Sequence, residues 1–462
     1  MSKMLKTISP INGEVYVERP LADADKITQA LAHAKASQQA WATKSVAERA
    51  EVCSAAVDAF VANKELIANE LTWQMGRPIR YSLGEVGGYE ERARYMIGAA
   101  PDALKSLQLE EKTGFTRYIK REALGVVFVV APWNFPFMTA VNAVMPALMA
   151  GNAVVLKHSA QTPLCAERMV ESFEKAGLPA GVFQYLHLSH ADTESIIASD
   201  KVNYVAFTGS VAGGEMVERA TAGTFKGIGL ELGGKDPAYI RADADIDQAV
   251  DTAIDGAFFN SGQSCCGIER IYVHEVVYDE FVEKAVALVK SYVLGRSDEE
   301  ATTLGPVVKT SAAEFVRAQV KDALAQGAVA HIDASDFAMA KSDTPYLAPQ
   351  VLTGVDHTMR IMQEESFGPV VGIQKVSNDE AAIALMNDSE FGLTASVFTS
   401  DIEVGIAIGE RLETGTFFIN RCDYLDPALA WTGVKNSGKG CTLSSLGYDY
   451  LTRPKSFHIK LP

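Results

Sequence analysis

The chain has 462 residues, of which 48% are hydrophobic and 22% are charged, and its formal net charge is −16 at pH 7. This length exceeds one ordinary hydrophobic core and predicts two large domains plus a smaller element. The acidic balance argues against nucleic acid and anionic membranes as partners. The richest apolar stretch, residues 137–151, is short and is interrupted by Asn142 and Pro146, so no membrane span is predicted.

The cysteines and the amino terminus indicate the compartment. The six cysteines have no regular spacing, which argues against a disulfide framework and fits a reducing environment. The first twenty residues lack an apolar core followed by small cleavage residues, so a cytoplasmic enzyme is expected. No CxxC pair or histidine cluster suggests a metal site, and none is predicted.

Helical patterns come first along the chain. Amphipathic helices are predicted over residues 24–41, 45–73 and about 80–100, and the second opens with Ser45 and Glu48 in the spacing of a capping box.

Short, nearly continuous apolar runs then alternate with helical segments. They are predicted as strands over residues 125–131, 152–157, 182–186 and 203–207. Such alternation implies right-handed crossovers and a parallel sheet that is covered on both faces. Ligands of such sheets bind at the carboxyl ends of the strands, so a dinucleotide is expected just after these runs.

A second alternating set follows residue 231 and predicts a second α/β domain. Its strands are expected over residues 270–275, 369–376, 394–399 and 415–420, and its helices near 277–294, 310–326 and 401–412. The segments 115–123 and 454–461 are interpreted as exposed strands without a sheet of their own.

Two segments carry candidate chemistry. Residues 258–270, FFNSGQSCCGIER, place Cys265 and Cys266 after an Asn-Ser-Gly-Gln turn, which favours a cysteine nucleophile on a loop. In LELGGK, Glu231 precedes a Gly-Gly pair, where backbone can approach closely and a carboxylate can act as general base. Each has a plainer interpretation, because free cysteines are usually small buried hydrophobes and lone glutamates are usually solvated.

Several separated motifs in a consistent order resemble the aldehyde dehydrogenase superfamily over nearly the whole chain. They include APWNFP at 131–136, N-x-G-Q-x-C ending at Cys265, and EESFGP at 364–369. The resemblance implies an α/β fold in three parts. These are a Rossmann-like dinucleotide-binding domain (1–104 and 124–233), a second α/β catalytic domain that holds the nucleophile (234–447), and a small β oligomerisation element (105–123 and 448–462).

The resemblance also implies the reaction. A cysteine thiolate attacks an aldehyde, hydride passes to NAD or NADP, and the resulting thioester is hydrolysed. The match assigns Cys265 as nucleophile, Glu231 as the base that activates water, and Asn134 as oxyanion donor together with the backbone N–H of Cys265. Cys266 is interpreted as a structural neighbour, and Asn134 alone could equally satisfy a turn.

The same resemblance assigns the residues that hold the dinucleotide. Lys157 is expected at the adenosine ribose, and Gly209 and Ser210 are expected near the pyrophosphate at a helix amino terminus. Glu365 is expected at the nicotinamide ribose, Phe367 beside the nicotinamide and Trp133 on the adenosine side. Taken singly, Ser210 could be an ordinary helix cap and Phe367 could be a core residue.

The chain departs from the family pattern at two places. NAD-preferring members commonly carry a glutamate where this chain has Ala160, so NADP is not excluded and the cofactor is left as NAD or NADP. His158 or Ser159 could contact a 2′-phosphate, or could have a surface or packing role. The family's P-F-G-G-x-K-x-S-G-x-G-R-E stretch becomes AWTGVKNSGKGCT here, a change that is expected to affect carboxyl-terminal packing rather than the chemistry.

The substrate is expected to be a small aldehyde. The short amino terminus and the KHS segment look most like the succinate-semialdehyde branch, but Phe259 stands where many such enzymes have an arginine. Arg421 is a hypothetical replacement as a carboxylate partner, and a surface ion pair is its plainer interpretation. Trp431 replaces a phenylalanine that is expected near the substrate mouth.

Two other functions stay open at this point. A coenzyme-A-acylating relative would pass the thioester to another thiol and would not need Glu231, and a family member without turnover would act as a structural or binding protein. In the family, the strands that match 115–123 and 454–461 pair between subunits, so a homodimer or homotetramer is expected.

Overall fold

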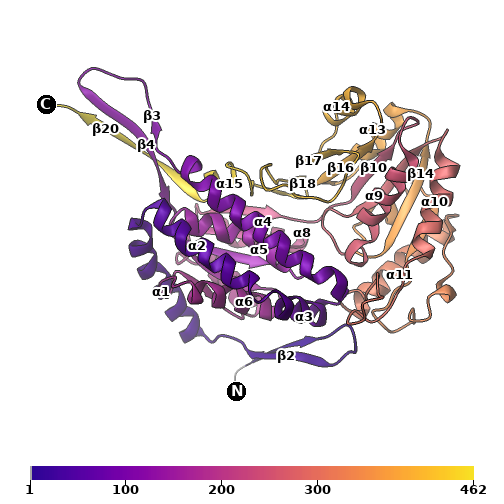
Figure 1. The fold of residues 1–462 in the computed structure, drawn as a ribbon, viewed down its shortest axis with the longest axis horizontal. Coiled ribbons are helices and arrows are strands. Elements are labelled where there is room, and N and C mark those ends of the chain that lie inside the picture. Colours follow the sequence, from indigo (N-terminus) through magenta and orange to yellow (C-terminus); the bar gives the residue numbers. More distant parts are fainter. Residues whose placement is uncertain (1–2) are drawn as a thin grey trace.

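The computed structural model describes residues 3–462 and forms two lobes with a projecting three-stranded arm (Figure 1). The first lobe is built on a six-stranded sheet in the order β19-β9-β8-β5-β6-β7, in which all neighbours are parallel except β19 and β9. Its strands are β5 (Val126–Ala131), β6 (Ala153–His158), β7 (Phe183–Tyr185), β8 (Tyr204–Thr208), β9 (Gly227–Glu231) and β19 (Gly438–Lys439).

Helices cover both faces of this sheet. They are α1 (Ala24–Thr43), α2 (Val46–Val61), α3 (Lys64–Met75), α4 (Ile79–Ala103), α5 (Pro136–Met149), α6 (Pro163–Lys175), α7 (His190–Ala198) and α8 (Val211–Thr221). Alternate residues of β5 enter two different cores: Val127 and Val129 contribute to one, whereas Val126, Phe128 and Val130 contribute to the other. Burial on both faces explains why these strands are continuously apolar in the sequence.

The second lobe contains a seven-stranded sheet in the order β12-β13-β14-β11-β10-β16-β17, parallel except between β12 and β13. Its strands are β10 (Asp236–Ile240), β11 (Ile268–His274), β12 (Val329–Ala330), β13 (Gln350–Thr353), β14 (Val370–Val376), β16 (Thr394–Phe398) and β17 (Thr416–Ile419). Its helices are α9 (Ile246–Phe258), α10 (Tyr278–Lys290), α11 (Thr310–Ala325), α12 (Arg360–Gln363), α13 (Asp379–Asn387) and α14 (Ile402–Gly409). The expected α/β class with two parallel-sheet units is confirmed.

The remaining short elements lie around these sheets. They are the amino-terminal hairpin β1 (Met4–Ile8) and β2 (Val15–Pro20), the pair β15 (Phe391–Gly392) and β18 (Val434–Lys435), and the helix α15 (Gly447–Tyr450).

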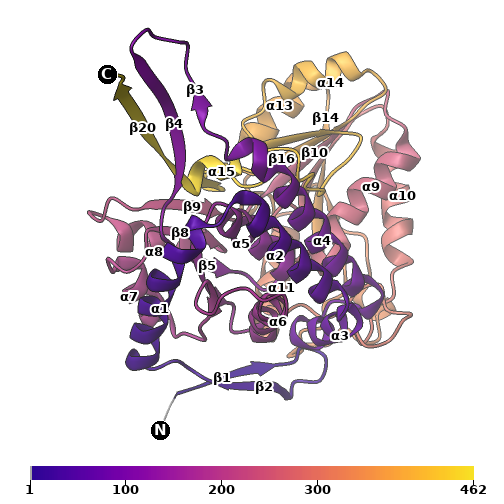
Figure 2. The same ribbon diagram turned by 60° about the vertical axis from the view of Figure 1, so that its left-hand side comes forward.

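The arm corrects one expectation. The two segments that the sequence presents as strands without a sheet pair with each other: β4 (Phe115–Ala123) and β20 (Thr452–Lys460) are antiparallel over nine residues each. A short strand, β3 (Leu107–Gln108), pairs with the other edge of β4. The arm extends away from both lobes in Figures 1 and 2.

The expected single helix over 45–73 is also wrong, because the structure has two helices there. Helix α2 ends at Val61 and α3 begins at Lys64, with a turn at Ala62 and Asn63. The predicted capping box is present: Ser45 Oγ accepts from the Glu48 N–H at 3.2 Å, and Glu48 accepts from the Ser45 N–H at 2.7 Å.

The topology places several predicted site residues along one edge. The parallel strands β6, β5, β8 and β9 are neighbours, so their carboxyl ends meet at the same side of the sheet. Lys157, Asn134, Gly209 and Glu231 lie at or just after these ends. No helix within residues 3–462 is both long enough and apolar enough to cross a membrane.

Candidate active site

The loop that carries Cys265 connects α9 to β11 through an unusual backbone turn. Asn260 and Ser261 have φ values of 54° and 57°, in the left-handed region that non-glycine residues rarely adopt. Gly262 follows with φ of 70°, and a Cβ there would lie 2.2 Å from the carbonyl oxygen of Gly368. The motif therefore needs glycine at this position, because the loop passes directly against the EESFGP segment.

Side-chain amides tie this loop to the segment after β5. Asn260 Nδ2 donates to the carbonyl oxygens of Asn134, at 3.3 Å, and of Gln263, at 3.2 Å. Asn134 Nδ2 also donates to Gln263 O at 3.2 Å. The Gln263 side chain accepts from the Val308 N–H at 2.7 Å. These bonds hold the predicted oxyanion residue beside the cysteine loop.

A buried arginine that the sequence analysis missed joins the two segments. Arg77 donates to Glu85 at 2.5 Å, to the Asn134 carbonyl at 2.5 Å and to Asn260 Oδ1 at 3.2 Å. Only 1% of Arg77 is exposed. Glu85 also accepts from the N–H groups at the start of α5. The buried Arg77–Glu85 ion pair and its hydrogen bonds therefore fix the turn at Asn134 relative to the loop that carries Cys265.

Cys265 is partly buried and its thiol favours the protonated form. A hydrogen bond with the Cys266 side chain and burial raise the pKa of Cys265 well above its ordinary value, and Glu231 and Asp236 add to this through their negative charges. The thiol therefore requires a proton acceptor or a compensating positive potential before it can attack. Cys266 is buried in the core of the first lobe, as a structural residue would be.

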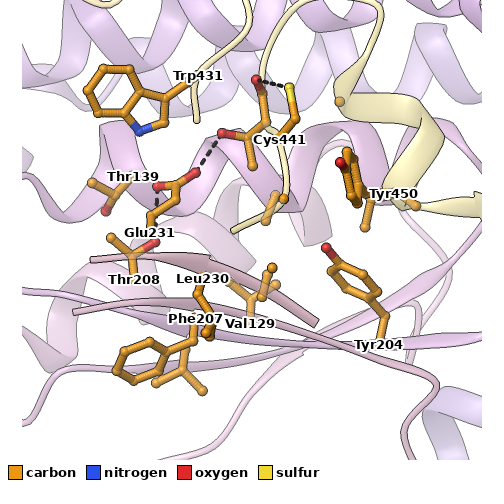
Figure 3. Close-up of a pocket in the computed structure, with 18 of the residues that line it drawn as sticks. Val129, Thr139, Tyr204, Phe207, Thr208, Leu230, Glu231, Trp431, Cys441 and Tyr450 are labelled. Carbon is orange, nitrogen blue, oxygen red and sulfur yellow. Dashed lines mark hydrogen bonds between the residues drawn. The ribbon is translucent and has the colours of Figure 1, made fainter. Parts of the chain in front are cut away.

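Glu231 ends β9 and is held by two threonines. Thr442 Oγ1 donates to Glu231 Oε1 at 2.5 Å, and Thr208 Oγ1 donates to Oε2 at 3.1 Å (Figure 3). Although part of the residue stays accessible, burial raises the pKa of its carboxyl, and the two hydroxyls partly offset that effect. A carboxyl with a raised pKa is suited to accept a proton near neutral pH.

A cavity adjoins the Glu231 carboxylate. Thr139, Trp431 and Cys441 line it together with the two threonines (Figure 3). The cavity has a volume of about 30 Å³, which exceeds the roughly 10–15 Å³ that one water requires, so it has room for water. Cys265 is not among the residues that line this cavity, whereas Glu231 is.

Thr442 corrects the expectation for the altered carboxyl-terminal motif. The loss of the family's Arg-Glu pair was expected to affect packing and leave the chemistry untouched, yet Thr442 contacts the predicted base directly. Reciprocal backbone hydrogen bonds of 2.9 Å between Trp431 and Thr442 fix this segment. Trp431, which was expected near the substrate mouth, is buried and lines the Glu231 cavity.

The Gly-Gly pair after Glu231 allows close approach between the lobes. A Cβ on Gly233 would lie 2.4 Å from Glu365 Oε1, and one on Gly234 would lie 2.5 Å from the Cys265 carbonyl. Glu365 accepts from the Gly234 N–H at 3.1 Å. Burial, followed by the nearby Glu269 charge, raises the pKa of Glu365 to about 7.

The segment that carries Glu365 is anchored by another missed residue. Glu269 accepts from the N–H groups of Ser366, at 2.7 Å, and Phe367, at 2.8 Å, and from Lys235 Nζ at 2.5 Å. Lys235 and Glu269 are both buried, so this ion pair links the residue after the Gly-Gly pair to the turn at Phe367. Phe367 itself has φ of 50°.

The structure makes two of the cofactor assignments incompatible. Trp133 contacts Phe367 edge to face, with ring centroids 5.6 Å apart, and both line one cavity with Glu365. Trp133 and Phe367 therefore lie at the same end of the expected dinucleotide site, and the end of the dinucleotide that they meet stays a prediction.

The residues assigned to the other end of the dinucleotide lie at the carboxyl edge of the first sheet. Lys157 is buried at the end of β6, and its Nζ makes no hydrogen bond to residues 3–462. Ser210 caps α8, accepting from the Gly213 N–H at 3.3 Å, and Gly209 precedes it. Lys157 and the α8 amino terminus lie at the same sheet edge, on β6 and after β8, with β5 between them, and each offers positive potential to an anionic group.

His158 has a packing role. It is buried, its Nε2 lies 3.2 Å from the Pro136 carbonyl, and its Nδ1 accepts from the Ser159 N–H at 3.0 Å. Burial lowers the pKa of His158 to about 3, so at neutral pH the ring carries no charge for a phosphate. The structure supports packing as the interpretation of His158.

Within the described part of the chain, Arg421 does not form the surface ion pair that was its plainer interpretation, and its role as a carboxylate partner stays a prediction. The residue is exposed and forms no ion pair with residues 3–462; its guanidinium lies 3.8 Å from the centre of the Tyr424 ring. The Tyr424 hydroxyl donates to Glu91 at 2.6 Å. Phe259 lies among aromatic rings, 5.3 Å from Tyr81 and 6.5 Å from Phe135.

The fold and this site define a class of protein: a two-lobed α/β oxidoreductase with a cysteine beside a dinucleotide-binding sheet edge. Comparison with known proteins makes the class specific. The profile of the Aldehyde dehydrogenase family matches residues 1–457. The chain therefore belongs to this family, and it is an enzyme that oxidises an aldehyde to the acid with NAD or NADP.

Named relatives agree with this membership. The chain is 33% identical to a succinate semialdehyde dehydrogenase [NAD(P)+] of Escherichia coli over 448 residues, which cover 96% of this chain and 95% of the relative. It is 33% identical to an NADP-dependent glyceraldehyde-3-phosphate dehydrogenase of Streptococcus equinus over 463 residues, covering 98% and 94%. A solved NAD+ complex of the Bacillus cereus aldehyde dehydrogenase superposes with a TM-score of 0.95 at 30% identity, covering 100% and 94%.

Proposed function

We propose that the protein is a non-acylating aldehyde dehydrogenase in which Cys265 is the nucleophile, Glu231 the general base and Asn134 an oxyanion donor. The Cys265 thiolate adds to the aldehyde carbon, and the amide of Asn134 and the backbone N–H of Cys265 stabilise the negative oxygen. A bound nicotinamide dinucleotide supplies the hydride acceptor. The resulting thioester on Cys265 is then attacked by water.

The observation that carries this proposal is the environment of Glu231. Its carboxyl has a raised pKa and adjoins a cavity with room for water. Only hydrolysis of the thioester requires such a base, because transfer to coenzyme A supplies its own nucleophile. Rotation of the Glu231 side chain away from Thr442 and Thr208 would bring the carboxylate toward Cys265, whose pKa already responds to the Glu231 charge.

The chain's own residues fit a dinucleotide. Lys157 at the end of β6 and the amino terminus of α8 offer positive potential at the sheet edge. Glu365 lies against the Gly-Gly pair after β9, where one carboxylate oxygen accepts from Gly234 N–H. Ala160 is exposed and carries no charge, so the chain presents no carboxylate there to repel a 2′-phosphate.

We propose ω-carboxy aldehydes as the substrate class, since relatives at 33% identity include enzymes named for succinate semialdehyde. We also propose that the arm mediates assembly into a homodimer or homotetramer. The outer edge of β20 has no partner strand within residues 3–462, and open edges of this kind favour pairing with another strand. Light scattering on the wild type and on a chain that ends at Leu451 would test the arm. The same number of subunits per particle in both proteins would refute its role in assembly.

The test of the reaction is cofactor reduction with aliphatic, aromatic and ω-carboxy aldehydes, using NAD and NADP, with and without coenzyme A. We expect reduction without coenzyme A and release of the free acid. Reduction that depends strictly on coenzyme A would overturn the hydrolytic assignment.

A further inference from the structure

Helix α4 places a buried arginine with no acidic partner close to the reacting groups. Arg92 is only 7% exposed, yet it forms no ion pair with any residue in 3–462. The two carboxylates whose charges act on Arg92 are committed elsewhere, since Glu85 pairs with Arg77 and Glu231 is held by two threonines. A buried charge without a counter-ion is costly and calls for a function.

The contacts of the Arg92 guanidinium leave part of it free. Nη1 donates to the Met138 carbonyl at 2.8 Å and to Asn142 Oδ1 at 3.3 Å. Nε and Nη2 make no hydrogen bond to the described residues, and neither nitrogen is fully enclosed. The two contacts fix the plane of the guanidinium on α5, and two adjacent donor groups are left for a ligand.

Asn142 fixes the orientation of this arginine. It is 2% exposed, and its Oδ1 accepts from Arg92 Nη1 at 3.3 Å. Its Nδ2 is enclosed by protein and makes no hydrogen bond of ordinary geometry to the described residues, but the Asn142 side chain lowers the pKa of the Glu231 carboxyl by hydrogen bonding. Asn142 therefore orients Arg92 and faces Glu231, and the free donors for a ligand are those of the guanidinium.

The pair lies near the place where the aldehyde reacts. Asn142 lies on α5 between Thr139 and Ala143, and these two residues line the cavity at the Glu231 carboxylate. The charges of Glu231, Cys266 and Cys265 also raise the pKa of Arg92, in opposition to the lowering by burial. The loop 421–431 also reaches this part of α4, because the Tyr424 hydroxyl donates to Glu91, the neighbour of Arg92.

We propose that Arg92, oriented by Asn142, binds the carboxylate of an ω-carboxy aldehyde while the aldehyde carbon is presented to Cys265. The proposal rests on the proposed function and names the residues that select its substrate class. It replaces Arg421, which is exposed and lies over Tyr424.

The test compares two four-carbon substrates, 4-oxobutanoate and butanal, through the ratio of their kcat/KM values. In Arg92→Met this ratio should fall about a hundredfold, mainly through a higher KM for 4-oxobutanoate, because a bidentate charged contact is lost. Arg92→Lys should keep part of the preference, and Asn142→Ala should lose less than Arg92→Met. Arg94→Met is the matched control: Arg94 is on the same helix but is exposed and pairs with Asp58 and Glu90, so the ratio should stay at the wild-type value.

The melting temperature and dinucleotide binding of each variant separate loss of the site from loss of the fold. An equal loss for both substrates in Arg92→Met and Arg92→Lys would overturn this inference alone and assign Arg92 to the thiol or to the scaffold. A wild type that oxidises butanal as well as 4-oxobutanoate would also overturn it. No cofactor reduction with any aldehyde would instead overturn the proposed function.

Discussion

Thr442 offers a direct perturbation of the proposed base. Its hydroxyl donates to Glu231 Oε1 at 2.5 Å, and this bond favours the charged carboxylate. In Thr442→Val the bond is lost while the Thr208 bond to Oε2 remains. Since a hydrogen bond to a charged group contributes roughly 1.5–3 kcal/mol, the unprotonated fraction of Glu231 at an acidic pH should fall by about tenfold or more.

The sign follows from the role of the base. Glu231 must be unprotonated to accept a proton from water, so a higher pKa moves the acidic limb of thioester hydrolysis to higher pH. The assay is the hydrolysis rate of preformed acyl-enzyme as a function of pH, with the amplitude of the initial burst as a check on acylation. Thr432→Val is the matched control, because Thr432 lines the same cavity but its hydroxyl donates to the Gly440 carbonyl at 2.7 Å. An acidic limb at the wild-type pH in Thr442→Val, or one moved to lower pH, would refute this reasoning.

Two further predictions concern the scaffold. Gly262→Ala should lower the apparent melting temperature far more than Gly177→Ala. Both glycines have φ between 70° and 79°, but a Cβ at Gly262 would lie 2.2 Å from Gly368 O, whereas a Cβ at Gly177 would meet nothing within 4 Å. Equal decreases in melting temperature would contradict the close approach at Gly262. The pKa of His158 is lowered to about 3 in the folded state, against about 6.5 for a histidine in the unfolded chain. The folded state is therefore favoured fully above pH 6.5, and this contribution to the unfolding free energy is lost as the pH falls from 6.5 toward 3. Between pH 6.5 and 5 the wild type should therefore lose about 2 kcal/mol more unfolding free energy than His158→Gln, which urea titrations at the two pH values would measure, and parallel losses would show that His158 is not buried neutral.

Sequence patterns predicted most of the sheet framework because burial on both faces leaves continuous apolar runs. The strand expected over 125–131 begins one residue before β5, and the strand expected over 152–157 begins and ends one residue before β6. Strands β9 and β10 went unpredicted, because GIGLE and DPAYI are short and carry glycine, proline and acidic residues. The break at Ala62 and Asn63 was missed because the apolar periodicity of α2 continues into α3.

Contacts between distant segments could not be predicted from local patterns. The pairing of β4 with β20 joins strands that are more than 300 residues apart, and the sequence of neither strand indicates which strand it pairs with. The contact between Thr442 and Glu231 spans 211 residues. One missed residue did leave a signal: Glu269 is a charge within the buried strand β11, and a buried charge requires partners.

The roles assigned to Cys265, Glu231 and Asn134 remain predictions that one measurement tests together. Glu231→Gln should be incubated with aldehyde and NAD or NADP, quenched, and digested for mass spectrometry of the peptide that contains both cysteines. The account predicts one equivalent of reduced cofactor per subunit and an acyl adduct on Cys265, since acylation proceeds while hydrolysis is slowed. An adduct on Cys266, or steady turnover at the wild-type rate without an adduct, would contradict it.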